Sequence, residues 1–241
     1  MRVLAIDTAL EACAAAVLDT TASGQAGNGP AANGLAPNEL AASETRAMAR
    51  GHAEALMPLI ARVMAAARLE FTQIDRIAVT TGPGSFTGVR VGIAAARGIA
   101  LAADKPAVGL STLAAFAAPH IAAGWVGNVM AVIDARHAHV YVQIFGAGGR
   151  SLVPAHLASL NDAVRAAIAG TTLVVGTAAE MLAAAWPAGE PPPTIIARAA
   201  PPIDWVARLG AAADAERAPP KPLYLRRPDA RPQHAGTLPR R

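Results

Sequence analysis

Apolar positions recur along this chain with two different periods. Short apolar runs rich in β-branched residues predict strands, and apolar residues spaced three and four positions apart predict helices. The strands are expected at residues 1–7, 12–19, 41–49, 74–81, 107–109, 129–134, 139–145 and 172–175. The helices are expected at residues 52–69, 86–103, from 111 onward, 161–169, 177–185 and 203–213. This mixture indicates an α/β fold.

The order of these elements predicts two related lobes. Two or three strands followed by helix, strand and helix occur in the first half, and a similar order returns loosely in the second. We therefore expect a first lobe at residues 1–105, a second lobe at 106–216 and a flexible tail at 217–241. Residues 22–38 are rich in Gly, Pro and Asn without periodicity, which predicts a surface insertion.

Composition narrows the class of protein. The chain has 241 residues, of which 53% are hydrophobic and 16% charged, so it can bury a substantial core. Cys13 is the single cysteine and is expected to be a core residue, and no His/Cys spacing suits zinc. No uncharged run reaches the roughly 18 apolar residues that a membrane span needs. A cytoplasmic protein without membrane association is the expectation.

The net charge of +4 is concentrated in the tail. From Arg217 onward there are seven basic residues and one acid, Asp229. Two interpretations remain open: a solvated tail, or a tail that adds contacts to RNA phosphates.

The glycine-rich stretch at residues 80–92 reads TTGPGSFTGVRVG. A Walker-type phosphate loop needs lysine and a hydroxyl residue after its last glycine, but Val89 and Arg90 follow Gly88. A dinucleotide fingerprint needs a third glycine where this chain has Thr87. What remains is a tight turn into a helix that Ser85 or Thr87 can cap, with an N-terminus able to attract an anion.

The helix after this loop carries small residues four apart, at Gly88, Gly92, Ala96 and Ala100. Each glycine costs about 1 kcal/mol of helix stability relative to alanine, so a close packing partner is expected. That partner is either the protein's own sheet or a helix of another subunit.

Several blocks together resemble the TsaB (YeaZ) family: VLAIDTA, GHAEALMPLI, DRIAVTTGPGSFTGVRVGIAAARGIALA, GLSTLAAFA, VIDARHAHVYVQIF and the late PLYLR. The resemblance covers most of residues 1–145. It implies the two-lobed actin/heat-shock-ATPase/sugar-kinase (ribonuclease H-like) fold with a degenerate nucleotide site. It also implies a non-catalytic subunit that binds and activates the ligase subunit TsaD in making threonylcarbamoyladenosine, 3′ of the anticodon of tRNAs.

The resemblance also implies partners. TsaD is expected to form a heterodimer with this chain, and TsaE is expected to join through that pair. A homodimer is the competing state when TsaD is absent. Contact with tRNA is expected only indirectly or through the basic tail.

The residues that a catalytic relative needs are changed in this chain. The metal-binding helix H-x-x-x-H of the relative is matched here by His52 and Leu56, which leaves one histidine with a structural or interface role. ATPases of this fold hold phosphate and metal with an Asp-x-Gly turn, but neither Asp7 nor Asp134 is followed by that glycine. The glycine-rich turn that binds adenosine in the second lobe of such ATPases is reduced here to one glycine, Gly176. We therefore expect no catalytic, cofactor-binding or metal-binding residues and no cofactor bound by the chain alone. Whether ATP or ADP binds in the assembled complex stays open.

The resemblance places the TsaD contact on the helices at 52–69 and 86–103. The expected interface residues are His52, Leu56, Leu59, Ile60, Val63, Ser85, Phe86, Thr87, Gly88, Arg90, Gly92 and Ala96.

The alternative function is a stand-alone ATPase or a peptidase-like enzyme of the same fold. A peptidase needs an activated nucleophile, but Ser85 has no identifiable His/Asp partner in the sequence and suits a helix cap. His137 and His139 lie two apart at an expected hairpin tip, where a metal would need a third ligand.

Overall fold

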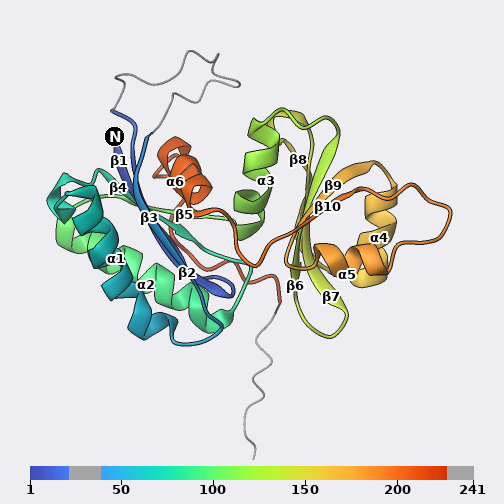
Figure 1. The fold of residues 1–241 in the computed structure, drawn as a ribbon, viewed down its shortest axis with the longest axis horizontal. Coiled ribbons are helices and arrows are strands. Elements are labelled where there is room, and N and C mark those ends of the chain that lie inside the picture. The colour runs from blue at the N-terminus through green and yellow to red at the C-terminus, as the bar shows by residue number, and fades with distance from the viewer. Residues whose placement is uncertain (22–38, 227–241) are drawn as a thin grey trace, which may run out of the picture.

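A computed structural model describes residues 1–21 and 39–226 of the chain, and it contains two five-stranded sheets (Figure 1). The first sheet has the order β3-β2-β1-β4-β5, and the second has the order β10-β9-β6-β7-β8. The strands are β1 (Arg2–Asp7), β2 (Ala12–Asp19), β3 (Glu39–Ala47), β4 (Arg76–Thr80), β5 (Ala107–Leu110), β6 (Asn128–Asp134), β7 (His139–Phe145), β8 (Ser151–Ser159), β9 (Thr171–Gly176) and β10 (Thr194–Ala197). The helices are α1 (His52–Ala67), α2 (Phe86–Ala103), α3 (Thr112–Ala122), α4 (Leu160–Ile168), α5 (Ala179–Ala184) and α6 (Ile203–Ala212), with 3₁₀ turns η2 (Phe71–Gln73) and η3 (Ala147–Gly149).

The two sheets repeat one topology. In each, the first strand pairs antiparallel with the second and parallel with the fourth, and the third and fifth strands form the edges. The predicted α/β fold with two related lobes is therefore confirmed. The strands β8 and β10 were not predicted, because β8 lies half-exposed and β10 follows a proline-rich stretch.

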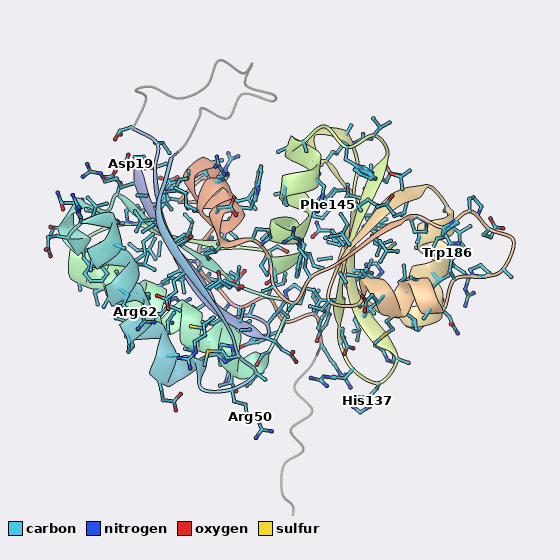
Figure 2. All side chains as sticks on the ribbon, in the orientation of Figure 1. Asp19, Arg50, Arg62, His137, Phe145 and Trp186 are labelled. Atoms are coloured by element: carbon cyan, nitrogen blue, oxygen red, sulfur yellow. The ribbon has the colours of Figure 1, made fainter. Side chains whose placement is uncertain are left out.

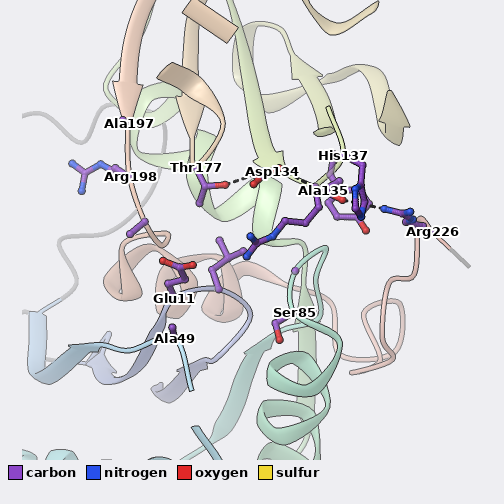
Figure 3. A pocket seen from close by; sticks show the side chains of 15 residues that line it. Glu11, Ala49, Ser85, Asp134, Ala135, His137, Thr177, Ala197, Arg198 and Arg226 are labelled. Atoms are coloured by element: carbon purple, nitrogen blue, oxygen red, sulfur yellow. Dashed lines mark hydrogen bonds between the residues drawn. The ribbon is translucent and has the colours of Figure 1, made fainter. Parts of the chain in front are cut away.

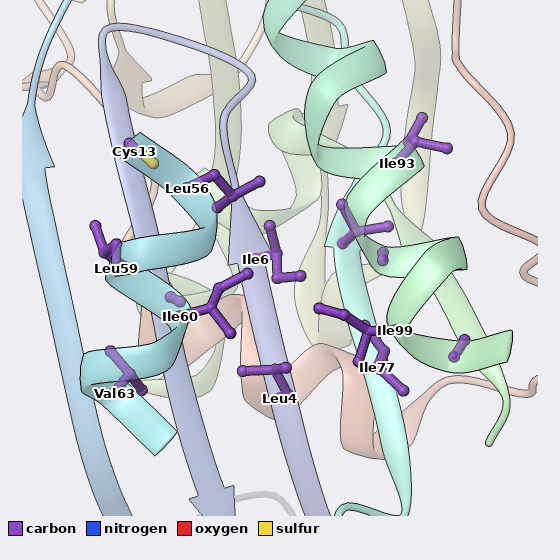
Figure 4. Close-up of a cluster of buried hydrophobic side chains, with 14 of the residues drawn as sticks. Leu4, Ile6, Cys13, Leu56, Leu59, Ile60, Val63, Ile77, Ile93 and Ile99 are labelled. Carbon is purple, nitrogen blue, oxygen red and sulfur yellow. The ribbon is translucent and has the colours of Figure 1, made fainter. Parts of the chain in front are cut away.

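Helices cover both faces of each sheet. In Figure 1, α1 and α2 lie on the outer face of the first sheet, α4 and α5 lie on the outer face of the second, and α6 and α3 lie between the sheets. The outer core of the first lobe joins Leu4, Ile6 and Ile77 of the sheet to Leu56 and Ile93 of the helices (Figure 4).

The lobe boundaries differ from those expected. Strand β5 lies beyond residue 105 but pairs with β4 in the first sheet. Helix α6, expected in the second lobe, packs on the first sheet, where Val206 and Ala207 contact the inner-face cluster. The chain therefore returns to the first lobe after building the second.

The expected flexible tail begins with an ordered segment. The N–H of Gly109 donates to the carbonyl of Ala218 at 2.8 Å, and the N–H of Leu223 donates to that of Thr81 at 2.8 Å. The Arg97 guanidinium donates to the Pro220 carbonyl at 2.6 Å. Residues 218–226, which we call the strap, thus cover the edge of β5 and the side of α2. The remaining tail residues 227–241 and the insertion 22–38 lie outside the described residues.

Helix α2 is the one helix in the described ranges that is long and apolar enough to cross a membrane. Helices that pack on a sheet can meet the same test, and α2 buries Val89, Ile93 and Ile99 in the first lobe. Length and composition are therefore weak evidence for a membrane span here.

Candidate functional site

The glycine-rich loop turns β4 into α2 and is held by Ser85. Gly82 adopts φ +102°, a backbone conformation that glycine tolerates at little cost. The Ser85 hydroxyl accepts the N–H of Gly88 at 3.3 Å, so Ser85 is the helix cap.

The small-residue stripe of α2 faces the protein's own sheet. A Cβ at Gly88 would lie 2.1 Å from the carbonyl oxygen of Thr8, and one at Gly92 would lie 2.5 Å from the Thr8 hydroxyl. Ala96 and Ala100 belong to the same buried cluster as β1 and β4. This corrects the expectation for Gly88, Gly92 and Ala96: they occupy an internal contact and present no surface to a partner.

The expected interface residues of α1 are also buried. Leu56, Leu59, Ile60 and Val63 point into the first core and are at most 2% exposed (Figure 4). The His52 ring nitrogen Nε2 lies 3.1 Å from the Leu10 carbonyl, a hydrogen bond that gives this histidine a structural role. The apolar stripe identified the core face of α1, so the expectation for these five residues is corrected too.

Four expected interface residues lie on the surface: Ser85, Phe86, Thr87 and Arg90. The Arg90 guanidinium lies 3.6 Å above the centre of the Phe86 ring. Its Nε donates to the Tyr224 hydroxyl at 2.8 Å, and the Phe86 and Tyr224 rings are 5.4 Å apart. We call Phe86, Arg90 and Tyr224 the aromatic rim.

An apolar groove runs between α1, η2 and α2 on the outer face of the first lobe. Its volume is about 400 Å³, and its walls include Met57, Phe71, Ala95 and Gly98. A Cβ added at Gly98 would meet nothing within 4 Å, because this glycine faces outward. This face was not among the predicted features, although Ala94, Gly98 and Ala102 repeat the four-residue spacing of the inner stripe.

A larger cleft of about 710 Å³ lies between the lobes (Figure 3). Glu11 and Ser85 line it from the first lobe, and Asp134, His137 and Arg198 line it from the second. The Asp134 carboxylate accepts the backbone N–H of Arg136 at 2.7 Å, which ties it to its own turn. The Arg226 guanidinium, at the end of the strap, donates to the Ala135 carbonyl at 3.1 Å across the cleft wall.

The sequence model of the family "TsaD: tRNA N6-adenosine threonylcarbamoyltransferase" matches residues 40–186, more than half of the chain. The "tRNA threonylcarbamoyladenosine biosynthesis protein TsaB" of Escherichia coli (strain K12) is 37% identical over 142 residues, which cover 58% of this chain and 53% of that protein. A Pseudomonas aeruginosa structure, described as an uncharacterized protein with similarity to peptidase YeaZ, has a TM-score of 0.70 at 27% identity over 93% of this chain and 99% of that one. The chain belongs to the TsaB/YeaZ family.

The family assignment extends over most of the fold. A Mycobacterium tuberculosis (strain H37Rv) relative, described as uncharacterized, is 35% identical over 185 residues, which cover 76% of this chain and 79% of that protein. The alignments with the E. coli and Haemophilus influenzae TsaB proteins span about half of those proteins' length. The predicted TsaB/YeaZ resemblance and its two-lobed fold are confirmed.

Asp7 of this TsaB/YeaZ chain is sealed inside the first lobe. The carboxyl is fully buried, and its Oδ1 accepts the N–H of Ala9 at 3.1 Å and the hydroxyl of Thr80. Burial raises the pKa of Asp7 above its usual 3.8, which favours the neutral form that metals bind poorly. The residues after Asp7 also pack directly on α2, where the N–H of Ser85 donates to the Ala9 carbonyl at 2.7 Å.

Ser85 and His137 are the serine and histidine that line the cleft within the described residues. Ser85 and His137 both line it, but no hydrogen bond between their side chains occurs in the described part of the chain. His137 and His139 lie at the hairpin tip, where Figure 2 labels His137, and the His139 ring nitrogen Nδ1 lies 2.7 Å from the His137 carbonyl. Within residues 1–21 and 39–226, no three His, Cys, Asp or Glu side chains gather as a metal site would require.

Proposed function

We propose that this TsaB/YeaZ-family chain is a non-catalytic subunit in tRNA threonylcarbamoyladenosine biosynthesis. It binds a TsaD-type transferase and supports the modification of the adenosine next to the tRNA anticodon. TsaE joins through that heterodimer, and the cytoplasm is the compartment in which the complex works. These assignments rest on the names of its relatives together with the surfaces of this chain.

The apolar groove on α1, η2 and α2 is the observation that carries the proposal. Met57 in its wall is 47% exposed, and seven of its eight lining residues are apolar or glycine. A contiguous exposed apolar patch of this kind marks a protein–protein contact site. Gly98 and the alanines beside it let a partner helix approach the backbone closely. The interface that we propose therefore consists of the outward faces of α1 and α2 in place of the buried residues expected from the sequence. It retains the exposed Ser85, Phe86, Thr87 and Arg90 at the start of α2.

The state of Asp7 supports a non-catalytic role. A carboxyl that is sealed from the cleft and hydrogen-bonded to Ala9 and Thr80 is not available to hold the metal of a nucleotide. We propose that the nucleotide site is degenerate and that ATP or ADP binds only in the assembled complex.

The test is co-purification with the cognate TsaD subunit. Gly98→Phe fills the groove without touching the core, so we expect the affinity for TsaD to fall by roughly tenfold or more, which corresponds to about 1.4 kcal/mol. Ala166→Phe is the matched control, because it adds the same ring to an exposed position of α4 in the second lobe. Equal binding by both variants would remove the groove from the interface.

The same groove predicts self-association when TsaD is absent. Mass measurement of the parent chain alone is expected to show a dimer that Gly98→Phe shifts toward the monomer. A dimer that persists in this variant would place self-association on another surface.

Magnesium-dependent ATP hydrolysis by the purified chain, or cleavage of peptides, tests the alternative enzymatic function. Robust turnover without TsaD that is lost in Asp7→Asn would contradict the non-catalytic assignment.

A further inference from the structure

The interlobe cleft carries arginines without carboxylate partners. Arg136 and Arg198 line the cleft, and neither forms an ion pair with any carboxylate of the described residues. The two acids of the cleft wall are Glu11 and Asp134, and Asp134 is bound to a backbone N–H. Guanidinium groups in this state are suited to bind phosphate, because their planar donors match its oxygens.

Aromatic side chains stand beside these cations. Phe86 follows the cleft residue Ser85, and Tyr224 lies two residues before the cleft residue Arg226, so the aromatic rim adjoins the cleft. Phe86 is 43% exposed and Tyr224 is 45% exposed. Arg90 holds both rings in place by stacking on one and donating to the other. Exposed rings next to a basic groove are typical of surfaces that stack unpaired bases.

A third guanidinium reaches the cleft from the strap. Arg226 lines the cleft and donates to the Ala135 carbonyl at its wall. Three arginines, Arg136, Arg198 and Arg226, therefore line the cleft against two acids.

We infer that the interlobe cleft and its aromatic rim bind a single-stranded segment of RNA. Arg136 and Arg198 contact phosphates, and an unpaired base stacks on Tyr224 of the rim. The inference rests on the proposed function, because the tRNA of that pathway supplies the RNA. It assigns the contact to the cleft, whereas the sequence alone placed any direct contact in the tail.

The experiment measures binding of the full chain to a labelled RNA anticodon stem-loop over a range of salt concentrations. Arg136→Ala/Arg198→Ala is expected to weaken binding and to reduce the slope of log affinity against log salt by about 2, since two phosphate contacts are lost. Tyr224→Leu is expected to weaken binding by roughly tenfold through lost stacking. The control Arg68→Ala/Arg150→Ala removes the same charge at two exposed positions that do not line the cleft.

Each outcome decides the inference. Loss in the cleft and rim variants that exceeds the loss in the control supports it. Equal loss in both double variants indicates attraction by net charge and overturns it, as does the absence of binding. Equal affinity for a fully double-stranded RNA, or binding of ATP alone at the same residues, also overturns it.

Failure of this inference and failure of the proposed function are distinguishable. Co-purification with TsaD reports on the outer groove and is expected to be unchanged in Arg136→Ala/Arg198→Ala. If the chain joins TsaD but does not bind RNA through the cleft, the proposed function holds and the inference is wrong. If the chain binds RNA through the cleft but never joins TsaD, the proposed function is wrong and the RNA site remains.

Discussion

The hydroxyl of Thr8 donates a hydrogen bond of 2.7 Å to the carbonyl oxygen of Gly88, which lies eighty residues later in the chain. This bond joins the turn after β1 to the first turn of α2, and it brings the two backbones into direct contact. Glycine is needed at position 88 because a Cβ there would lie 2.1 Å from the Thr8 carbonyl oxygen.

Two glycines of α2 should respond in opposite directions to alanine. Gly88→Ala is expected to destabilise the protein by about 1–3 kcal/mol, because the new methyl group overlaps backbone that cannot move away. Gly98→Ala is expected to stabilise it by about 0.5–1 kcal/mol, since the site is open and alanine favours the helix. Urea denaturation of both variants measures the difference, and shifts of equal sign would contradict the packing described for α2.

Asp7 should make stability depend on pH. Its folded-state pKa is raised above 3.8 by burial, so its contribution to stability is complete below that value and is lost as the pH rises through the folded-state pKa. Asn at this position keeps an acceptor for Ala9 and Thr80 and adds no charge.

We therefore expect Asp7→Asn to be more stable than the parent at pH 7 and similar to it near pH 3. Thermal unfolding across this range measures the effect. A parent and variant with parallel pH profiles would show that Asp7 is not sealed.

Cys13 should be unreactive in the folded protein. The side chain is fully buried, and burial, followed by the nearby charges of Asp7 and Glu44, raises the pKa of its thiol to about 11. The reactive thiolate is therefore scarce near neutral pH. Labelling with a disulfide reagent at pH 8 is expected only after denaturant is added, and rapid labelling of the native chain would contradict the burial of β2.

Arg76 should hold α6 on the first sheet. Its Nη1 donates to the carbonyls of Gly210, Ala211 and Ala213 at 2.9, 3.2 and 2.6 Å, which satisfies the end of α6. Arg76→Met keeps much of the apolar stem and removes these donors.

We expect Arg76→Met to lower the free energy of unfolding by about 1.5–3 kcal/mol. Amide hydrogen exchange in α6 should accelerate more than exchange in α4, which does not contact Arg76. Uniform acceleration across both lobes would mean that Arg76 acts on the fold as a whole.

Much of the local structure could be predicted from periodicity. Helices α1 and α2 lie within two residues of their expected bounds, and Ser85 caps α2 as its type and position suggested. Strand β8 was missed because it is half-exposed and contains Pro154 and His156, and β10 was missed because it has four residues and follows a proline-rich stretch. These two strands are stabilised by pairing, β8 with β7 and β10 with β9.

The candidate site was predicted less well than the fold. The expected interface on α1 consisted of core residues, because the most regular apolar stripe of a helix is the one that packs on its own sheet. The cleft residues Arg136, Arg198 and Arg226 come from separate segments, and no spacing in the sequence connects them. All three rim residues lie within blocks that the sequence singled out, but nothing in the sequence showed that the block with Phe86 and Arg90 meets the block with Tyr224.

By itself, the sequence determined the two-lobed α/β class, the family, and which residues of each helix share a face. Tertiary structure alone decided what each face contacts. Gly88 and Gly98 show this limit of the sequence, because both lie in rows of small residues along α2. Helical geometry predicts which residues share a row, but it does not predict what packs against that row. The neighbour of Gly88 is Thr8, brought there by the pairing of β1 with β4, whereas nothing in the described chain covers Gly98.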